Sequence, residues 1–149
     1  MTGAIAERLM IQLDPSLYEL HHLGVVVSDI EAAQERYAAL GFRNGERFEV
    51  PEQGIIAVTY RMGAGYLELI QPTDPEGAIA RFMAKRGEGM HHIAFRVENL
   101  QDILDRLAAD GVRLIDTAPR RGAHGWRVAF LHPEAGNGVL IELLEDDSR

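Results

Sequence analysis

The sequence predicts an α+β fold in which two β-α-β-β-β modules form paired, curved mixed sheets around a cleft. The first observation is an internal repeat, in which the segment that begins at His21-His22 recurs at His91-His92. The offset of 70 residues also aligns Val27 with Val97, Arg36 with Arg106 and Gly41 with Gly111. The second observation is that each copy ends in an apolar run with one acidic residue in its middle, Glu68 or Glu142. A repeat of this kind indicates that the fold is built from two similar modules.

The first copy is predicted to begin with a strand over 20–27, followed by a helix over 30–40. Ser28 or Asp29 can cap this helix, and Gly41 ends it. The spacing places Ile30, Ala33, Tyr37 and Leu40 on one helical face. Strands are predicted at 42–50, 55–62 and 66–71, because Pro- and Gly-rich turns at 51–54 and 63–65 separate the β-rich runs.

A linker helix near 76–86 follows Pro75, and the second copy then repeats the order of the first. We expect a strand over 90–97, a helix over 100–109 and strands near 112–116, 127–131 and 139–144. The helix has an apolar face of Leu100, Ile103, Leu104 and Leu107. The predicted organisation is an N-terminal extension at 1–18, a first module at 19–74, a linker at 75–88 and a second module at 89–149. The extension contains several apolar residues, which predict a short helix or strand packed on the body.

Composition excludes several classes of protein. The 149 residues suffice for one domain with a shared core, and 46% hydrophobic and 26% charged residues are ordinary for a globular protein. A net charge of −8 disfavours nucleic acid as a partner. Cysteine is absent, which excludes disulfides and thiolate chemistry. The sequence shows neither a signal peptide nor an apolar run of about 20 residues, so we expect a cytoplasmic protein that does not interact with membranes.

Strand alternation places four chemically important side chains on one face of the predicted sheets. Val25 and Val27 share the face that packs under the first helix, and Phe95 and Val97 do so in the second copy. The opposite face then holds His22, Glu68, His92 and Glu142. His21 and His91 have the other parity and are interpreted as structural residues or as supports for the ligands.

This set of four predicts a metal site, because a carboxylate buried among apolar residues requires a partner or a metal. A single strand histidine is usually structural, but repeated His and Glu pairs are hard to explain by chance. We therefore predict that His22, Glu68, His92 and Glu142 bind one divalent first-row metal. Co²⁺ is the first choice, and Ni²⁺, Zn²⁺, Mn²⁺ or Fe²⁺ are alternatives. Further coordination positions would suit a substrate that chelates through two oxygens, with the metal acting as a Lewis acid.

These residues resemble the vicinal oxygen chelate superfamily and, within it, the methylmalonyl-CoA epimerase family. The similar stretches span most of 20–145, and the more specific ones are Gly122-Ala123-His124-Gly125 and Phe130-Leu131-His132-Pro133. The resemblance implies a metal-dependent interconversion of (2R)- and (2S)-methylmalonyl-CoA, a step of propionate metabolism. A base removes the C2 proton, the metal stabilises the enolate, and the opposite face is reprotonated. It also implies an acyl-CoA substrate and a homodimer.

Some members of the family have a Glu, proposed as one base, five residues after the Glu of Pro51-Glu52-Gln53-Gly54. This chain has Ala57 at that position, so the candidate bases are other residues. Glu142 is our first candidate base, and Glu68, which stands where some relatives have Gln, is the second. His124 lies in a Gly-flanked loop and is a candidate for substrate binding. Arg120 and Arg121, with Lys85 and Arg86, are candidates for binding the CoA phosphates, although two-residue basic clusters are more often plain surface.

Three other functions are compatible with parts of this pattern. A glyoxalase-type lactoylglutathione lyase would use the same metal frame on a glutathione hemithioacetal, and the four ligands alone do not exclude it. A dioxygenase would use two histidines and one carboxylate on Fe²⁺, which the second Glu disfavours. A metal-free binding protein of the same fold would leave two Glu residues unpaired. Metal content separates this last alternative from the enzymes.

Overall fold

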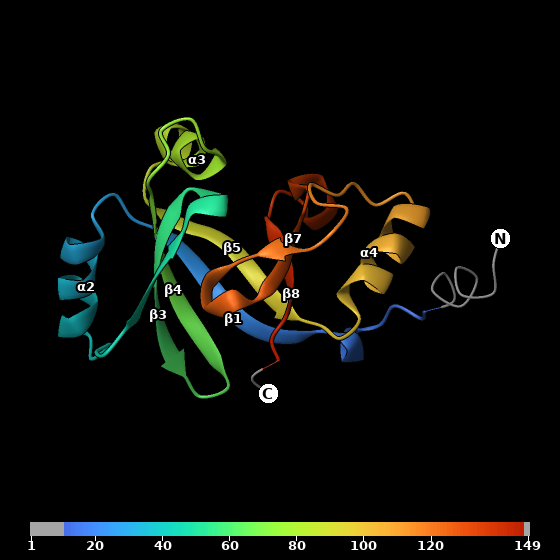
Figure 1. Ribbon diagram of the computed structural model, residues 1–149, viewed down its shortest axis with the longest axis horizontal. Helices are drawn as coiled ribbons and strands as arrows, with labels where there is room; N and C mark the ends of the chain where they lie inside the picture. The colour runs from blue at the N-terminus through green and yellow to red at the C-terminus, as the bar shows by residue number, and fades with distance from the viewer. Residues whose placement is uncertain (1–10, 148–149) are drawn as a thin grey trace. The chain divides into compact units, whose positions relative to one another are not determined.

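The computed structural model describes residues 11–147 and divides the chain into two compact units (Figure 1). The first-half unit comprises His21–His92 together with Arg121–Gly125. The second-half unit comprises the described residues up to Leu20, Ile93–Arg120 and the residues from Trp126 onward. The boundary falls inside strand β5 (Gly89–Arg96), which is continuous through both units. The predicted module boundaries near 74 and 88 stay a prediction.

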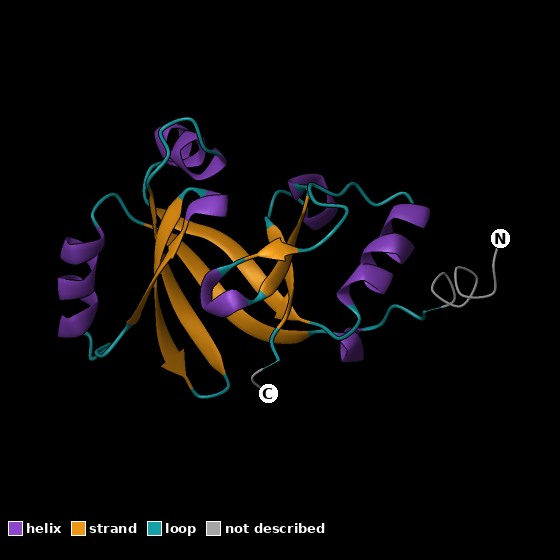
Figure 2. Ribbon diagram, in the orientation of Figure 1, coloured by secondary structure: helices purple, strands orange, loops and turns teal. Residues whose placement is uncertain are grey.

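The first-half unit has the strand order β2-β3-β4-β1 (Figure 2). Its strands are β1 (Glu19–Val26), β2 (Glu46–Val50), β3 (Ile55–Met62) and β4 (Gly65–Pro72). β1 pairs with β4 in parallel, whereas β3 is antiparallel to both β2 and β4. The 3-10 turn η2 (Pro51–Gln53) and Gly54, which has a φ of +64°, connect β2 to β3. Glycine adopts this left-handed conformation without the cost of a side chain.

Helix α2 (Ile30–Ala39) covers the outer face of this sheet. Asp29 caps it by accepting a hydrogen bond from the Ala32 amide, as the sequence predicted. Its buried residues Ile30 and Ala33 join a core that also contains residues from β3 and β4 and the residue that follows β1: Val58, Tyr60, Leu67, Leu69 and Val27. Leu40 was expected on this face, and that prediction is wrong. Leu40 is the C-cap residue and is 72% exposed, because the chain turns away at Gly41 with a φ of +103°.

The second-half unit repeats this arrangement around helix α4 (Leu100–Ala109), whose bounds the sequence predicted. Strand β5 pairs in parallel with β8 (Ile141–Glu145), and β7 (Arg127–Leu131) is antiparallel to β8. The predicted helix face is confirmed, since all four of its members are buried: Leu100, Ile103, Leu104 and Leu107. The two-residue strand β6 (Arg120–Arg121) completes the order β5-β8-β7-β6, and all eight strands belong to one sheet.

The predicted strand over 112–116 is wrong, since this segment makes only one isolated bridge, between Leu114 and Leu131. The cause is Asp116. Its carboxylate accepts the Phe130 amide at 2.9 Å, and the amides of Ile115 and Asp116 both donate to the Phe130 carbonyl. Side-chain bonds of this kind compete with a regular ladder.

Several further boundaries differ from the prediction by one to four residues, including the starts of β2 and of the linker helix. β2 begins at Glu46 rather than near Phe42, because Asn44 has a left-handed φ of +59° and turns the chain. The linker helix α3 (Ala78–Arg86) begins two residues after the predicted position and ends at Gly87.

The N-terminal extension is partly described. Residues 1–10 lie outside the described part, whereas Pro15–Leu17 form a 3-10 turn (η1) capped by Asp14. Leu13 and Tyr18 pack on the core of the second-half unit, which confirms that this part of the extension packs on the body. Among the described residues, no helix is long and apolar enough to cross a membrane.

Removal of a core side chain from α4 tests this packing. Leu104 is fully buried in the second-half core, so Leu104→Ala should lower the free energy of unfolding by about 2–5 kcal/mol. Urea denaturation measures this loss. The control Ala108→Ser changes an exposed position on the same helix and should stay within about 0.5 kcal/mol of the parent. Equal effects of the two substitutions would contradict the assigned core.

Candidate metal centre

Two imidazoles and one carboxylate meet in the first-half unit. His22 lies in β1, Glu68 in β4 and His92 at the end of this unit's part of β5. The Nε2 atoms of His22 and His92 are 3.0 Å apart, and Glu68 Oε1 lies 3.7 Å from the first and 3.5 Å from the second. The three residues are only 2%, 6% and 3% exposed, respectively. Such burial is unfavourable for ionisable groups unless they share a counter-charge.

Strand register and one glycine bring these groups together. Glu68 is the pairing partner of Gly24, which places both residues on the face of the sheet that also holds His22. A Cβ atom at Gly24 would lie only 2.1 Å from Cε1 of His92, so the absence of a side chain provides the space for that imidazole. Gly24 was not among the residues predicted for the site. A glycine inside an apolar strand was a usable signal, because it often marks a close approach.

Each of the two histidines is held by the histidine that precedes it. Nδ1 of His22 lies 2.8 Å from Nδ1 of His21, and Nδ1 of His92 lies 2.9 Å from Nδ1 of His91. A proton on Nδ1 of His22 and of His92 would leave both Nε2 lone pairs directed at the shared space. This tautomer is the one that metal-binding histidines adopt when their second nitrogen donates to a neighbour. The rings of Tyr66 and Phe82 pack against His21 and His91.

The distances fit a metal ion. With bonds of about 2.1 Å, two nitrogens 3.0 Å apart subtend about 90° at a metal. By the same construction, the two distances from Glu68 correspond to roughly 110–125°. All of these angles occur in four- to six-coordinate sites of first-row metals, so the donor atoms of the first-half unit are compatible with a shared divalent ion.

Glu142 belongs to the second-half unit. It lies in β8 opposite Ala94 of β5, and parallel pairing puts both side chains on one face. Ala94 is two residues after His92 in the same strand, so Glu142 emerges on the face that holds His92. Glu142 is 4% exposed. The buried set of His22, His92 and Glu142 is consistent with a divalent metal ion.

His124 belongs to the first-half unit although it is distant in sequence. Its Nε2 lies 2.8 Å from the Thr59 hydroxyl, and its ring lies 4.0 Å from Phe48 between centroids. Thr59 pairs with Glu68, so His124 covers the sheet face on which Glu68 stands. Its φ of +58° is uncommon for a residue with a side chain, and such strained conformations cluster at functional sites. The role of Thr59 had no signal in the sequence.

The candidate basic residues occupy different environments. Arg121 and His124 line one cavity of about 270 Å³ beside Phe48 and Glu52. The Arg121 carbonyl accepts a hydrogen bond from Gln53, which ties this loop to the Pro51–Gln53 turn. The exposed Arg120 instead pairs with Asp116 at 3.3 Å and lies over the Phe130 ring. Lys85 and Arg86 end α3, where Arg86 lies over Phe82.

Comparison with known families identifies the class of this fold and site. The model of the Glyoxalase/Bleomycin resistance protein/Dioxygenase superfamily matches residues 21–130. This match covers well over half of the chain, and the chain therefore belongs to that superfamily, as its sequence motifs suggested.

Individual relatives give a more specific comparison than the superfamily model. The uncharacterized protein YqjC of Bacillus subtilis is 39% identical over 85% of this chain and 91% of its own length. The ethylmalonyl-CoA/methylmalonyl-CoA epimerase of Cereibacter sphaeroides is 36% identical over 83% of this chain and 95% of its own length. A solved structure of methylmalonyl-CoA epimerase in complex with methylmalonyl-CoA and NH4+ superposes with a TM-score of 0.84. It is 35% identical and covers 89% of this chain and 96% of that one.

The space at Gly24 gives a direct test of the metal centre. Gly24→Ala should displace the His92 imidazole and weaken Co²⁺ binding by roughly 10–100-fold. Isothermal titration calorimetry with Co²⁺ measures the change. Val25→Ala alters the next residue, which faces the opposite side of the sheet, and should leave the affinity for Co²⁺ intact. Unchanged Co²⁺ binding by Gly24→Ala would disprove the site.

Proposed function

We propose that this chain is an epimerase that interconverts (2R)- and (2S)-methylmalonyl-CoA. The main support is the buried His22, His92 and Glu142 set in a chain whose relatives include named methylmalonyl-CoA epimerases. Glu68 adds a second buried carboxylate next to both imidazoles. An epimerase needs a base at C2 and a stabiliser for the negative charge that develops on the thioester oxygen.

The residues that would hold the metal are His22, Glu68, His92 and Glu142, with Co²⁺ as the first choice among divalent ions. When bound, the metal supplies Lewis acidity at the oxygens of the substrate. The side chains of the protein orient the ligands and exclude water. The flanking histidines fix the ring orientation of the two imidazole ligands, and the buried sheet face excludes water from the substrate thioester.

Proton transfer falls to the buried carboxylates. Glu142 is the first candidate to take the C2 proton, and Glu68 is the second, because Ala57 provides no carboxylate on β3. The electron pair of the broken C–H bond moves to the thioester oxygen to form the enolate, and a proton returned to the opposite face of C2 completes the inversion. Two carboxylates on one sheet face provide an acid and a base without a further residue.

His124 would bind the substrate above this face. Its imidazole already bonds the Thr59 hydroxyl, and its loop is tied to the Pro51–Gln53 turn. Arg121 lines the same cavity and could meet the CoA phosphates together with Arg120. The homodimer and the cytoplasmic location stay predictions.

A deuterium-exchange experiment tests the reaction and its base. In D₂O, the Co²⁺-loaded protein should exchange the C2 proton of methylmalonyl-CoA and interconvert its epimers. Glu142→Gln keeps an oxygen for the metal but cannot accept a proton, so exchange should fall by roughly 10²–10⁴-fold at unchanged cobalt content. The matched variant Glu68→Gln should lose less exchange than Glu142→Gln, because Glu142 is the first candidate base and Glu68 the second. NMR measures exchange, and atomic absorption measures cobalt.

Two results would contradict this assignment. Full activity of Glu142→Gln with a large loss in Glu68→Gln would reverse the order of the two bases. An inactive wild-type protein with stoichiometric cobalt would exclude the epimerase. The hemithioacetal of methylglyoxal and glutathione would then test the glyoxalase-type alternative, and absence of cobalt binding would favour the metal-free binding protein.

Substitution of His124 tests its proposed contact with substrate. His124→Gln should raise KM for methylmalonyl-CoA roughly 10-fold with a smaller change in kcat, because the loss of one hydrogen bond to the substrate weakens binding before the transition state is formed. His132→Gln removes a histidine that caps another turn and should leave KM near the wild-type value. A fall in kcat at constant KM would instead assign His124 to the chemical step.

A further inference from the structure

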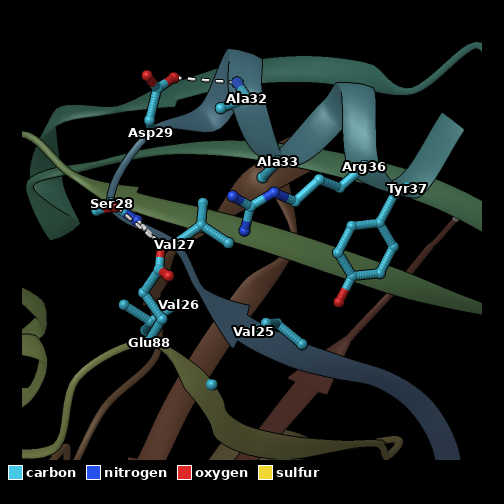
Figure 3. A pocket seen from close by; sticks show the side chains of 11 residues that line it. Val25, Val26, Val27, Ser28, Asp29, Ala32, Ala33, Arg36, Tyr37 and Glu88 are labelled. Carbon is cyan, nitrogen blue, oxygen red and sulfur yellow. Dashed lines mark hydrogen bonds between the residues drawn. The ribbon is translucent and has the colours of Figure 1, made fainter. Parts of the chain in front are cut away.

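A cavity of about 290 Å³ lies on the outer face of the first-half unit, away from the metal centre (Figure 3). Its floor includes Val25 of β1 and Val27, which follows that strand, and α2 forms its wall through Ala33, Arg36 and Tyr37. Figure 3 shows that Arg36 and Tyr37 extend from α2 over these valines. We call this cavity the α2 groove. It lies on the sheet face opposite His22, so it does not belong to the proposed active site.

The internal repeat gives this groove a counterpart within the same chain. The offset of 70 residues maps Val25 to Phe95 and Arg36 to Arg106. In the second-half unit, this α4 groove is filled by residues 11–18. Leu13 and Tyr18 pack on its core, and the Tyr18 ring lies 5.9 Å from Phe95. Arg106 Nη1 donates to the Ile11 carbonyl at 2.6 Å. The α4 groove therefore binds a peptide segment, interrupted by the 3-10 turn at Pro15–Leu17, through an arginine and apolar contacts.

The α2 groove lacks such a segment because the chain that precedes β5 takes a different path. Residues 78–86 form α3, whose Phe82 packs on His91, whereas residues 11–18 precede β1 and cover α4. Only Glu88 reaches the α2 groove, where it accepts hydrogen bonds from the amide and the hydroxyl of Ser28, both at 2.8 Å. The two grooves thus share an arginine, but one of them has no peptide from the described chain.

Side-chain size and exposure also differ between the two grooves. Arg36 is exposed, whereas the Arg106 side chain is only 27% exposed beneath its peptide. Val25 and Ala33 stand where the α4 groove has Phe95 and Ile103, so the α2 groove is wider. An occupant of the α2 groove can therefore be bulkier than Leu13 at the corresponding position.

We propose that the α2 groove binds an extended segment of a partner protein. The segment would present a backbone carbonyl to Arg36 and an apolar side chain two residues later, as Ile11 and Leu13 do in the α4 groove. A neutral carbonyl suits this groove better than an anion, because Asp29 and Glu88 add negative charge beside Arg36. The hydrogen bonds from Ser28 lower the pKa of Glu88, so this charge persists near neutral pH.

A foreign segment fits better than residues 11–18 of a second copy. Those residues already pack on the α4 groove of their own chain, where their tether gives them a high effective concentration. Their transfer to another molecule would expose the α4 groove of their own chain in order to cover the α2 groove of the other. A partner peptide gains the new contacts without that loss, and recognition of extended segments by apolar grooves is a common mode of binding.

A displayed library of nine-residue peptides with a fixed Ile-x-Leu core tests this inference. The folded full-length protein should enrich peptides that bind with Kd of roughly 10–500 μM, which is typical of short segments that become ordered on binding. Arg36→Gln should weaken their binding about 10-fold through loss of the charge-assisted hydrogen bond. Ala32→Leu, at an exposed position of α2 that also lines the groove, should fill it and abolish binding. Arg43→Gln removes an exposed arginine outside the groove and should leave binding unchanged.

Amide chemical shifts then locate the bound peptide. Shifts confined to Val25, Ala33, Arg36 and Tyr37 would support the α2 groove. Failure to enrich any peptide, binding that survives both Arg36→Gln and Ala32→Leu, or shifts centred on α4 would overturn the inference. Self-association that Arg36→Gln abolishes would replace the foreign partner by a second copy. Cobalt binding and methylmalonyl-CoA exchange should stay unchanged in Arg36→Gln, so this result is independent of the proposed epimerase activity.

Discussion

The structure depends on the burial of ionisable side chains within otherwise apolar strands. His22, Glu68 and His92 are almost fully buried and lie within 3.7 Å of one another. Unshared carboxylates at such positions would cost several kcal/mol of folding free energy, because the interior solvates charge poorly. A bound divalent ion would remove this penalty by placing positive charge at the point where the donor atoms meet. Parallel pairing of β1 with β4, the missing side chain at Gly24 and the paired histidines all serve this arrangement.

Duplication explains why one sheet can supply such a set. Each copy places a histidine on its first strand and a glutamate on its last strand, and parallel pairing of those strands aligns the two side chains on one face. The copies differ in the segments around this frame. Residues 121–125 join the first-half unit and bring His124 over Thr59, whereas residues 11–18 cover α4. The common frame thus holds the donor atoms, and the segments that differ determine what else can bind.

The sequence predicted the parts that depend on periodicity and on the repeat. The bounds of β3, α4 and β7 follow from apolar spacing between glycine and proline turns, and the strand parity of His22 and Glu68 follows from alternation. Features that depend on tertiary contacts could not be predicted from the sequence. The strand expected at 112–116 fails because the Asp116 side chain takes the Phe130 amide, and the placement of His124 depends on Thr59, which is distant in sequence. Leu40 has the spacing of the apolar face of α2, but it is the C-cap residue and is exposed.

The two copies also serve as internal references for each other. Positions that agree include the histidine and glutamate pairs, which are the proposed ligands of the metal centre. Positions at which the two copies differ reflect the different contacts that the outer face of each unit makes. Phe95 and Ile103 lie beneath a peptide segment, whereas Val25 and Ala33 lie in a groove of about 290 Å³. The α2 groove keeps the arginine that binds a backbone carbonyl in the α4 groove, but its floor carries the smaller side chains. The asymmetry of the outer faces therefore supports the inference that the α2 groove binds a peptide segment, a function that the metal centre does not require.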